Sequence, residues 1–147
     1  KKKDSAVNAV YYPVSINDLN KTDKRESGYC RVKVEGKDLS FYGKKIKTKN
    51  KNFWVYAANP EKIKKPSKSH PIVQSYVDLF IGGCFQIKER YKINEFPKQC
   101  VETTTEWSKH WVNDRVHARR PFLVPNFYKI DKLLSNYFDY YLENKYQ

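Results

Sequence analysis

The chain has 147 residues, and its 29 basic against 16 acidic side chains give a formal net charge of +13. Twelve tyrosines, eight phenylalanines and three tryptophans exclude a disordered tail, and the length is enough for one domain with an ordinary core. The longest apolar stretch, near residues 76–85, contains Asp78 and is too short to cross a bilayer, so no membrane association is expected.

The first predicted elements are a strand over residues 6–14 and a helix over residues 16–26. Valines and tyrosines favour the strand. The helix is predicted because Ser15 followed by Asp18 resembles an N-cap with an acidic third position, which is typical of a helix that begins at Ile16.

Strands dominate the next part of the chain. Residues 29–34 alternate as the side chains of a strand do, and the turn Glu35-Gly36-Lys37-Asp38 follows them. These strands are expected over residues 29–34, 39–47 and 53–58. Residues 5–60 are therefore expected to supply the strands of a small β-structure that carries one helix.

The second half of the chain predicts helices. Residues 61–69, rich in Lys, Pro and Ser, indicate a linker, after which Ser69 is expected to cap a helix that extends to about Lys88. Gly82 and Gly83 interrupt this helix and predict the close approach of another backbone.

Shorter helices are expected near residues 95–103 and over residues 128–144, so residues 70–147 form a mainly helical extension. Strands followed by helices indicate an α+β fold, with residues 1–147 as a single domain.

Cysteines and processing signals bear on the compartment. Cys30, Cys84 and Cys100 are odd in number and lack CxxC spacing, so neither a disulfide framework nor a metal site is indicated, and Cys84 is expected to be a buried apolar filler. With no secretory signal pattern, an intracellular location is expected, with the cytoplasm preferred and mitochondria as the organellar alternative. The chain contains no Met, which predicts a segment upstream of Lys1.

A family resemblance begins at the pattern Asp23-x-x-Glu26, which precedes Gly28-Tyr29-x-Arg31-Val32-x-Val34. This pattern resembles the central motif of the gamma-glutamylcyclotransferase-like superfamily. Later segments resemble a bacterial-type branch of it, in order along most of the chain. They are His70–Asp78, Gly83-Cys84, Thr103-Thr104 with Trp107, and Trp111–Arg115 with Arg120-Pro121.

The resemblance implies a small mixed β-barrel flanked by helices. It also implies a lyase reaction without metal or cofactor, in which the α-amine of a gamma-glutamyl amide or dipeptide attacks its own side-chain carbonyl. The products are 5-oxoproline and a free amine. The acid/base glutamate of the family matches Glu26, and a carboxylate at this position could both accept and return the proton.

The chain departs from the family at the substrate-cradling Tyr-Gly-Ser-Leu loop, since Tyr42-Gly43 is followed by two lysines. Either the loop lies upstream of Lys1, or the domain is a degenerate, non-catalytic relative. Glu26 itself has a structural alternative, as a helix-end carboxylate paired with a neighbour such as Arg31. Asp23 is expected to order the corner between helix and strand.

The basic charge suggests a second function, binding to RNA or to another acidic complex. Lysines cluster beside aromatic residues, a mixture that phosphates and bases favour. The candidate contacts are Lys44, Lys45, Lys47, Lys49, Lys51 and Trp54. A solvated hairpin is the competing interpretation, because lysine greatly outnumbers arginine.

The segment Trp111–Arg115 also has two interpretations. Asn113 or Arg115 could position a substrate, but we expect the segment to pack its Trp and to pair Asp114 with an arginine.

Overall fold

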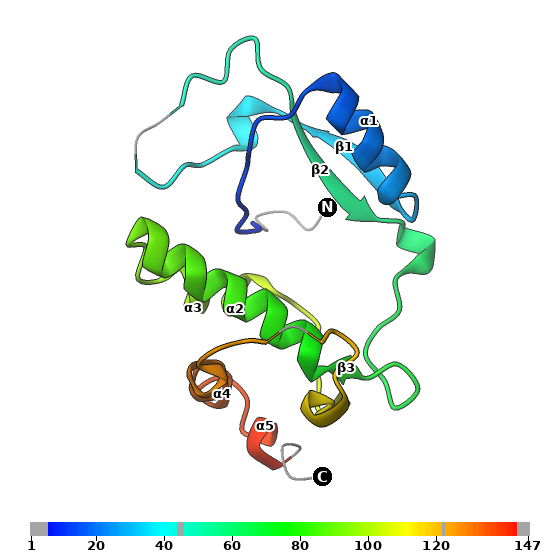
Figure 1. Cartoon of the computed structure of the whole chain (residues 1–147), viewed down its shortest axis with the longest axis vertical. Coiled ribbons are helices and arrows are strands. Elements are labelled where there is room, and N and C mark those ends of the chain that lie inside the picture. Colours follow the sequence, from blue (N-terminus) through cyan, green and yellow to red (C-terminus); the bar gives the residue numbers. More distant parts are fainter. Residues whose placement is uncertain (1–5, 44–45, 122, 144–147) are drawn as a thin grey trace. The chain divides into compact units, whose positions relative to one another are not determined.

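The computed structural model describes residues 6–43, 46–121 and 123–143 (Figure 1). The chain divides into two compact units, one of residues Val10–Lys64 and one of residues 1–9 and 65–147. We call them the hairpin unit and the helical unit and treat each by itself. Helices and small sheets both occur, so the chain is mixed α+β. No sheet in the described ranges closes into a barrel, so the predicted barrel is not confirmed.

The hairpin unit contains helix α1, Ile16–Arg25, where the sequence predicted a helix. The Ser15 hydroxyl oxygen accepts a hydrogen bond from the Asp18 N–H at 3.1 Å, which confirms the predicted N-cap. Asp18 in the first turn and Arg25 in the last turn complement the helix dipole.

Two of the predicted strands form an antiparallel pair. Strand β1, Tyr29–Val34, pairs with β2, Phe53–Ala58, and the register sets Tyr29 opposite Ala58 and Val34 opposite Phe53. Between them a short 3₁₀ turn covers Gly36–Asp38, and another, Pro60–Lys62, follows β2.

The predictions of strands over residues 6–14 and 39–47 were wrong wherever the structure describes those ranges, because the backbone there is irregular and lacks a partner strand. Lys44 and Lys45 lie outside the described residues. The Tyr11 ring instead makes edge-on contacts with Phe41 and Phe53, at 6.0 Å and 6.2 Å between ring centroids. Apolar residues in these segments therefore pack without joining a hydrogen-bonded ladder.

The helical unit contains four helices in its described part: α2 (Gln74–Tyr91), α3 (Phe96–Thr103), α4 (Phe127–Ser135) and α5 (Tyr140–Glu143). Two short strands, β3 (Ile72–Val73) and β4 (Trp111–Val112), pair in parallel, and a 3₁₀ turn spans Arg115–His117. The mainly helical C-terminal half thus agrees with the sequence.

Two helix boundaries differ from the prediction. Helix α2 begins at Gln74, not next to Ser69, because Ile72 and Val73 extend to pair with β4. The expected C-terminal helix is interrupted after Ser135. The interruption allows the Phe138 ring to contact Trp107 with 5.1 Å between ring centroids.

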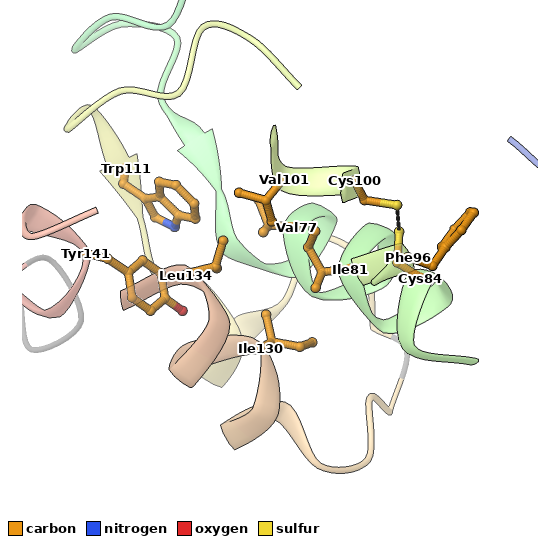
Figure 2. Close-up of a cluster of buried hydrophobic side chains, with 10 residues drawn as sticks. All are labelled: Val77, Ile81, Cys84, Phe96, Cys100, Val101, Trp111, Ile130, Leu134 and Tyr141. Carbon is orange, nitrogen blue, oxygen red and sulfur yellow. Dashed lines mark hydrogen bonds between the residues drawn. The ribbon is translucent and has the colours of Figure 1, made fainter. Parts of the chain in front are cut away.

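The buried residues all belong to the helical unit; among the described residues of the hairpin unit, none is buried. Figure 2 shows the core where α2, α3, α4, β4 and α5 meet. It comprises Val77, Ile81, Cys84, Phe96, Cys100, Val101, Trp111, Ile130, Leu134 and Tyr141. Cys84 is buried in this core, as the sequence predicted.

The two glycines of α2 have different surroundings. A Cβ atom on Gly82 would lie 3.1 Å from Cγ1 of Val124, while a Cβ on Gly83 would meet no atom within 4 Å. The close neighbours of Gly82 are the side chains of Val124 and Ile130, so the predicted approach of another backbone is not seen at either glycine.

Gly83→Ala should therefore raise the free energy of unfolding by about 0.5–1 kcal/mol, because alanine loses less conformational entropy in a helix and has room here. Gly82→Ala is the matched control, and its free energy of unfolding should rise less, since the side chain of Val124 must shift. Urea denaturation of both variants measures the difference. A larger gain at Gly82 than at Gly83 would contradict this account.

Candidate active site at the Glu26 corner

Backbone hydrogen bonds on both sides fix the position of Glu26. It is the C-cap of α1, where its N–H donates to the carbonyl of Thr22 at 2.8 Å. Its own carbonyl accepts from the Tyr29 N–H at 2.9 Å, at the start of β1. The carboxylate therefore projects from a corner held by regular structure before and after it, as the sequence predicted.

The Glu26 side chain is 29% exposed, and its Oε1 accepts a hydrogen bond from Nε of Arg25 at 2.9 Å. Arg25 is its neighbour in sequence and is 69% exposed. An ion pair this open to water contributes little to stability, about 0–1 kcal/mol. Arg31, the partner suggested by the structural alternative, is ion-paired with a different residue.

That residue is Asp23, whose Oδ2 lies 3.0 Å from Nη1 of Arg31. Its Oδ1 accepts a 2.6 Å hydrogen bond from the hydroxyl of Tyr56. Arg31 and Tyr56 are directly opposite each other in the β1–β2 pair, so one carboxylate of α1 joins both strands. Desolvation and the bond to Asp23 raise the pKa of Tyr56. Asp23 therefore orders this corner, as expected.

Sequence reasoning missed Tyr56 as a member of this corner. The signal was the register: once residues 29–34 and 53–58 are paired as a hairpin, Tyr56 falls opposite Arg31. The Arg31 guanidinium carbon also lies 4.7 Å from the centroid of the Trp54 ring. Asp23, Arg31, Trp54 and Tyr56 thus form one polar and aromatic group beside Glu26.

The candidate nucleic-acid contacts are divided between described and undescribed residues. Lys47, Lys49 and Lys51 are exposed in the connection that leads into β2. Lys44 and Lys45 lie outside the described residues. Trp54 is 39% exposed, and the Arg31 guanidinium lies over its ring. The structure therefore leaves at most part of this indole surface for a base to stack on.

A second polar cluster, in the helical unit, centres on Arg115. Its guanidinium donates to both carboxylate oxygens of Asp78, at 2.6 Å and 2.7 Å. It also donates to both oxygens of Asp131, at 2.8 Å and 3.1 Å. Both aspartates are buried, and the hydrogen bonds to them raise the pKa of Arg115 despite the opposing effect of burial.

Three uncharged side chains complete this cluster. The Tyr141 hydroxyl donates to Asp131 at 2.6 Å, and the Gln74 amide donates to Asp78 at 2.7 Å. The indole N–H of Trp111 donates to the Gln74 carbonyl oxygen at 2.9 Å.

Within the part of the chain that the structure describes, no buried side-chain nitrogen or oxygen lacks a partner. These groups bond to one another, so the cluster is structural, and Arg115 belongs to the fold rather than to a substrate site.

Asp114 stabilises the start of α2 from a distant part of the chain. The N-cap residue Val73 offers no side-chain acceptor, and Asp114 Oδ1 accepts the Ser75 N–H at 2.8 Å instead. Its Oδ2 accepts from the Ser75 hydroxyl and from the backbone N–H of Arg119, at 2.7 Å and 2.8 Å. Asp114 thus contacts Arg119 only through the main-chain N–H, and the expected pairing with an arginine side chain is not seen among the described residues.

Burial acts to raise the pKa of Asp114, but the hydrogen bonds from Arg119 and Ser75 outweigh it and hold this pKa below its ordinary value. Because the folded pKa lies below the unfolded value of about 3.9, the stabilisation is present above that pH and is lost as pH falls through the folded pKa. Asp114→Asn should cost about 0.5–2 kcal/mol at neutral pH. Urea denaturation at neutral and acidic pH measures the difference in free energy of unfolding between the variant and the parent protein. This difference should become smaller in acid, and a difference that does not change with pH would contradict the prediction.

His110 and His117 belong to no group of three or more His, Cys, Asp or Glu side chains that could hold a metal ion, as far as the described residues show. No helix in the described ranges is long and apolar enough to span a membrane. The corner of α1 and β1, with Glu26 beside the Asp23 group, is thus the candidate site. No protein-family model, curated protein or solved structure matches the chain.

Proposed function

We propose that the protein is a gamma-glutamylcyclotransferase-like lyase that converts a gamma-glutamyl amide or dipeptide to 5-oxoproline and a free amine. Glu26 is the acid/base residue in this proposal. The order of sequence motifs from Asp23 to Pro121 supports it, and so does the local structure around Glu26.

The observation that carries the proposal is the division of roles between the two carboxylates of the corner. Asp23 binds Arg31 and Tyr56, so the side-chain contacts that join α1 to the strands do not involve the Glu26 carboxylate. Glu26 has a fixed backbone and a partly exposed side chain that contacts the exposed Arg25. A carboxylate fixed at its base, yet not needed for the fold, suits proton transfer.

The chemistry moves two protons from the α nitrogen to the leaving nitrogen. The substrate α-ammonium gives one proton to the Glu26 carboxylate, and the resulting amine attacks the gamma carbonyl carbon to form the ring. Glu26 returns this proton to the leaving nitrogen as the bond from the carbonyl carbon to that nitrogen breaks. The ring nitrogen gives up its second proton to the released amine, so that the products are the lactam of 5-oxoproline and an ammonium ion. The atoms balance without water, metal or cofactor.

The fold expected for this activity includes a closed β-barrel, of which β1 and β2 would be two neighbouring strands. The described residues supply one antiparallel pair for such a sheet. A closed barrel would need further strands beside this pair, and we include that in the proposal.

The test is a product assay in which the protein is incubated with a panel of gamma-glutamyl amides and dipeptides. The proposal expects 5-oxoproline and free amine in equal amounts, well above the uncatalysed rate. A heat-denatured sample is the control. If the protein gives no 5-oxoproline above this control with any member of the panel, the proposed function is wrong.

RNA binding is the second candidate function, favoured by the exposed Lys47, Lys49 and Lys51 next to the Trp54 strand. If these lysines contact phosphates, affinity for single-stranded RNA should fall steeply with added salt as counterions are released. Replacing all three by glutamine should reduce the magnitude of the slope of log K against log salt by about 2, at roughly 0.7 for each lost contact with a single strand. Fluorescence anisotropy across a salt series measures both slopes. The matched control replaces Lys88, Lys92 and Lys109 of the helical unit; equal slopes for the two triple variants would rule out a specific role of the β2 connection.

A further inference from the structure

Two cysteines from neighbouring helices meet in the core of the helical unit. Cys84 lies on the face of α2 that also carries Val77 and Ile81, and Cys100 lies on α3. Figure 2 shows the two sulfur atoms directed at one another. The distance between them is 2.7 Å. Both residues are buried, with 5% of Cys84 and 2% of Cys100 exposed.

We propose that Cys84 and Cys100 are a redox pair that closes into a disulfide joining α2 to α3. Their sulfurs need to approach by only roughly 0.6–0.7 Å to reach the S–S bond length of about 2.05 Å. They come from two helices that already pack against each other, so the bond would join neighbouring elements of the fold. Cys30, in contrast, is exposed on β1 in the hairpin unit.

The oxidant in this proposal is a low-molecular-weight disulfide such as oxidised glutathione. One cysteine, as its thiolate, attacks a sulfur of this disulfide, forms a mixed disulfide and releases one thiol. The second cysteine attacks the protein sulfur of the mixed disulfide, forms the Cys84–Cys100 bond and releases the other thiol. Two protein thiols are oxidised, and one small disulfide is reduced to two thiols.

Burial governs the rate of this reaction. It raises the pKa of both cysteines, so the folded protein holds them as thiols, which are poor nucleophiles. Exchange therefore proceeds through local opening of α3, a helix of 8 residues at the edge of the cluster. Closure should be slow under native conditions and faster at urea concentrations that promote local opening without unfolding the chain.

The bond would link residues 16 positions apart in the sequence. Cross-links of this span restrict the unfolded chain, and the oxidised protein should melt about 10 °C higher than the reduced protein. The pair therefore connects thiol oxidation to the stability of the helical unit.

The experiment uses the Cys30→Ser chain, which removes the exposed thiol and its intermolecular disulfides. This chain is equilibrated with oxidised glutathione in low urea, then unfolded and alkylated under non-reducing conditions. The proposal expects the loss of two hydrogen atoms in intact mass and no alkylated cysteine. It also expects a proteolytic peptide linking Cys84 to Cys100, and a higher melting temperature that dithiothreitol reverses.

The same experiment can also overturn the proposal. Two alkylated cysteines, or glutathione adducts in place of the internal link, would show that the pair does not close. A closed link without a rise in melting temperature would refute the stabilising effect. Cys100→Ala in the same background is the matched control and should show neither the internal link nor the reversible shift.

Discussion

Replacing Arg115 by methionine should lower the free energy of unfolding by about 3–5 kcal/mol, the largest effect expected for a single substitution in this chain. The change removes the guanidinium that binds both Asp78 and Asp131, and it leaves two buried carboxylates without this positive charge. Methionine keeps much of the side-chain volume, so the loss reports on charge and hydrogen bonds rather than on a cavity.

Urea denaturation at neutral pH measures this effect, with Arg25→Met as the matched control. Arg25 forms an exposed pair, and its substitution should cost no more than about 1 kcal/mol. A triple variant that also carries Asp78→Asn and Asp131→Asn should recover part of the stability, because no buried charge is left unpaired. Equal losses in free energy of unfolding for the two arginine variants would show that the Arg115 cluster does not stabilise the fold.

Glu26→Gln should lower the rate of 5-oxoproline release by roughly a hundredfold or more, the largest expected effect on activity. Glutamine keeps the size of the side chain but cannot exchange a proton. Stability should change by less than about 1 kcal/mol, since only the exposed contact with Arg25 is affected. The measurement combines the product assay on the variant protein with its thermal unfolding.

Asp23→Asn is the matched control for Glu26→Gln, because it alters the other carboxylate of the same corner. It weakens the ion pair with Arg31 and the hydrogen bond from Tyr56, so the melting temperature should fall. The folded fraction should keep its activity. If Glu26→Gln cyclises substrate as fast as the parent protein, Glu26 is not the acid/base residue.

The sequence predicted the elements whose signals are local. Helix α1 has its cap at Ser15, and β1 and β2 alternate in side-chain character close together in the chain. The segments 6–14 and 39–47 carry similar residue types, yet they are not strands where described, because a strand also needs a partner edge. Composition reveals which residues suit a strand, but not whether a partner is available.

For the same reason, the sequence could predict the polar corner near Glu26 but not the polar cluster around Arg115. Asp23, Glu26 and Arg31 are close in sequence, so their corner could be predicted from local order. Asp78 and Arg115 are 37 positions apart, and only the packed helical unit brings them together. The available signal was the pair Gln74 and Asp78, two polar residues at helical spacing on a face that α2 buries.

The distant cap of α2 has a consequence for the order of folding. The central turns of this helix depend on bonds between residues four apart and can form in about a microsecond. Its first turn depends on Asp114, which is 39 positions from Ser75, so the intervening chain must close into a loop before the cap exists. Helix α2 should therefore grow from its interior and be completed at its N-terminus only after β3 and β4 have met.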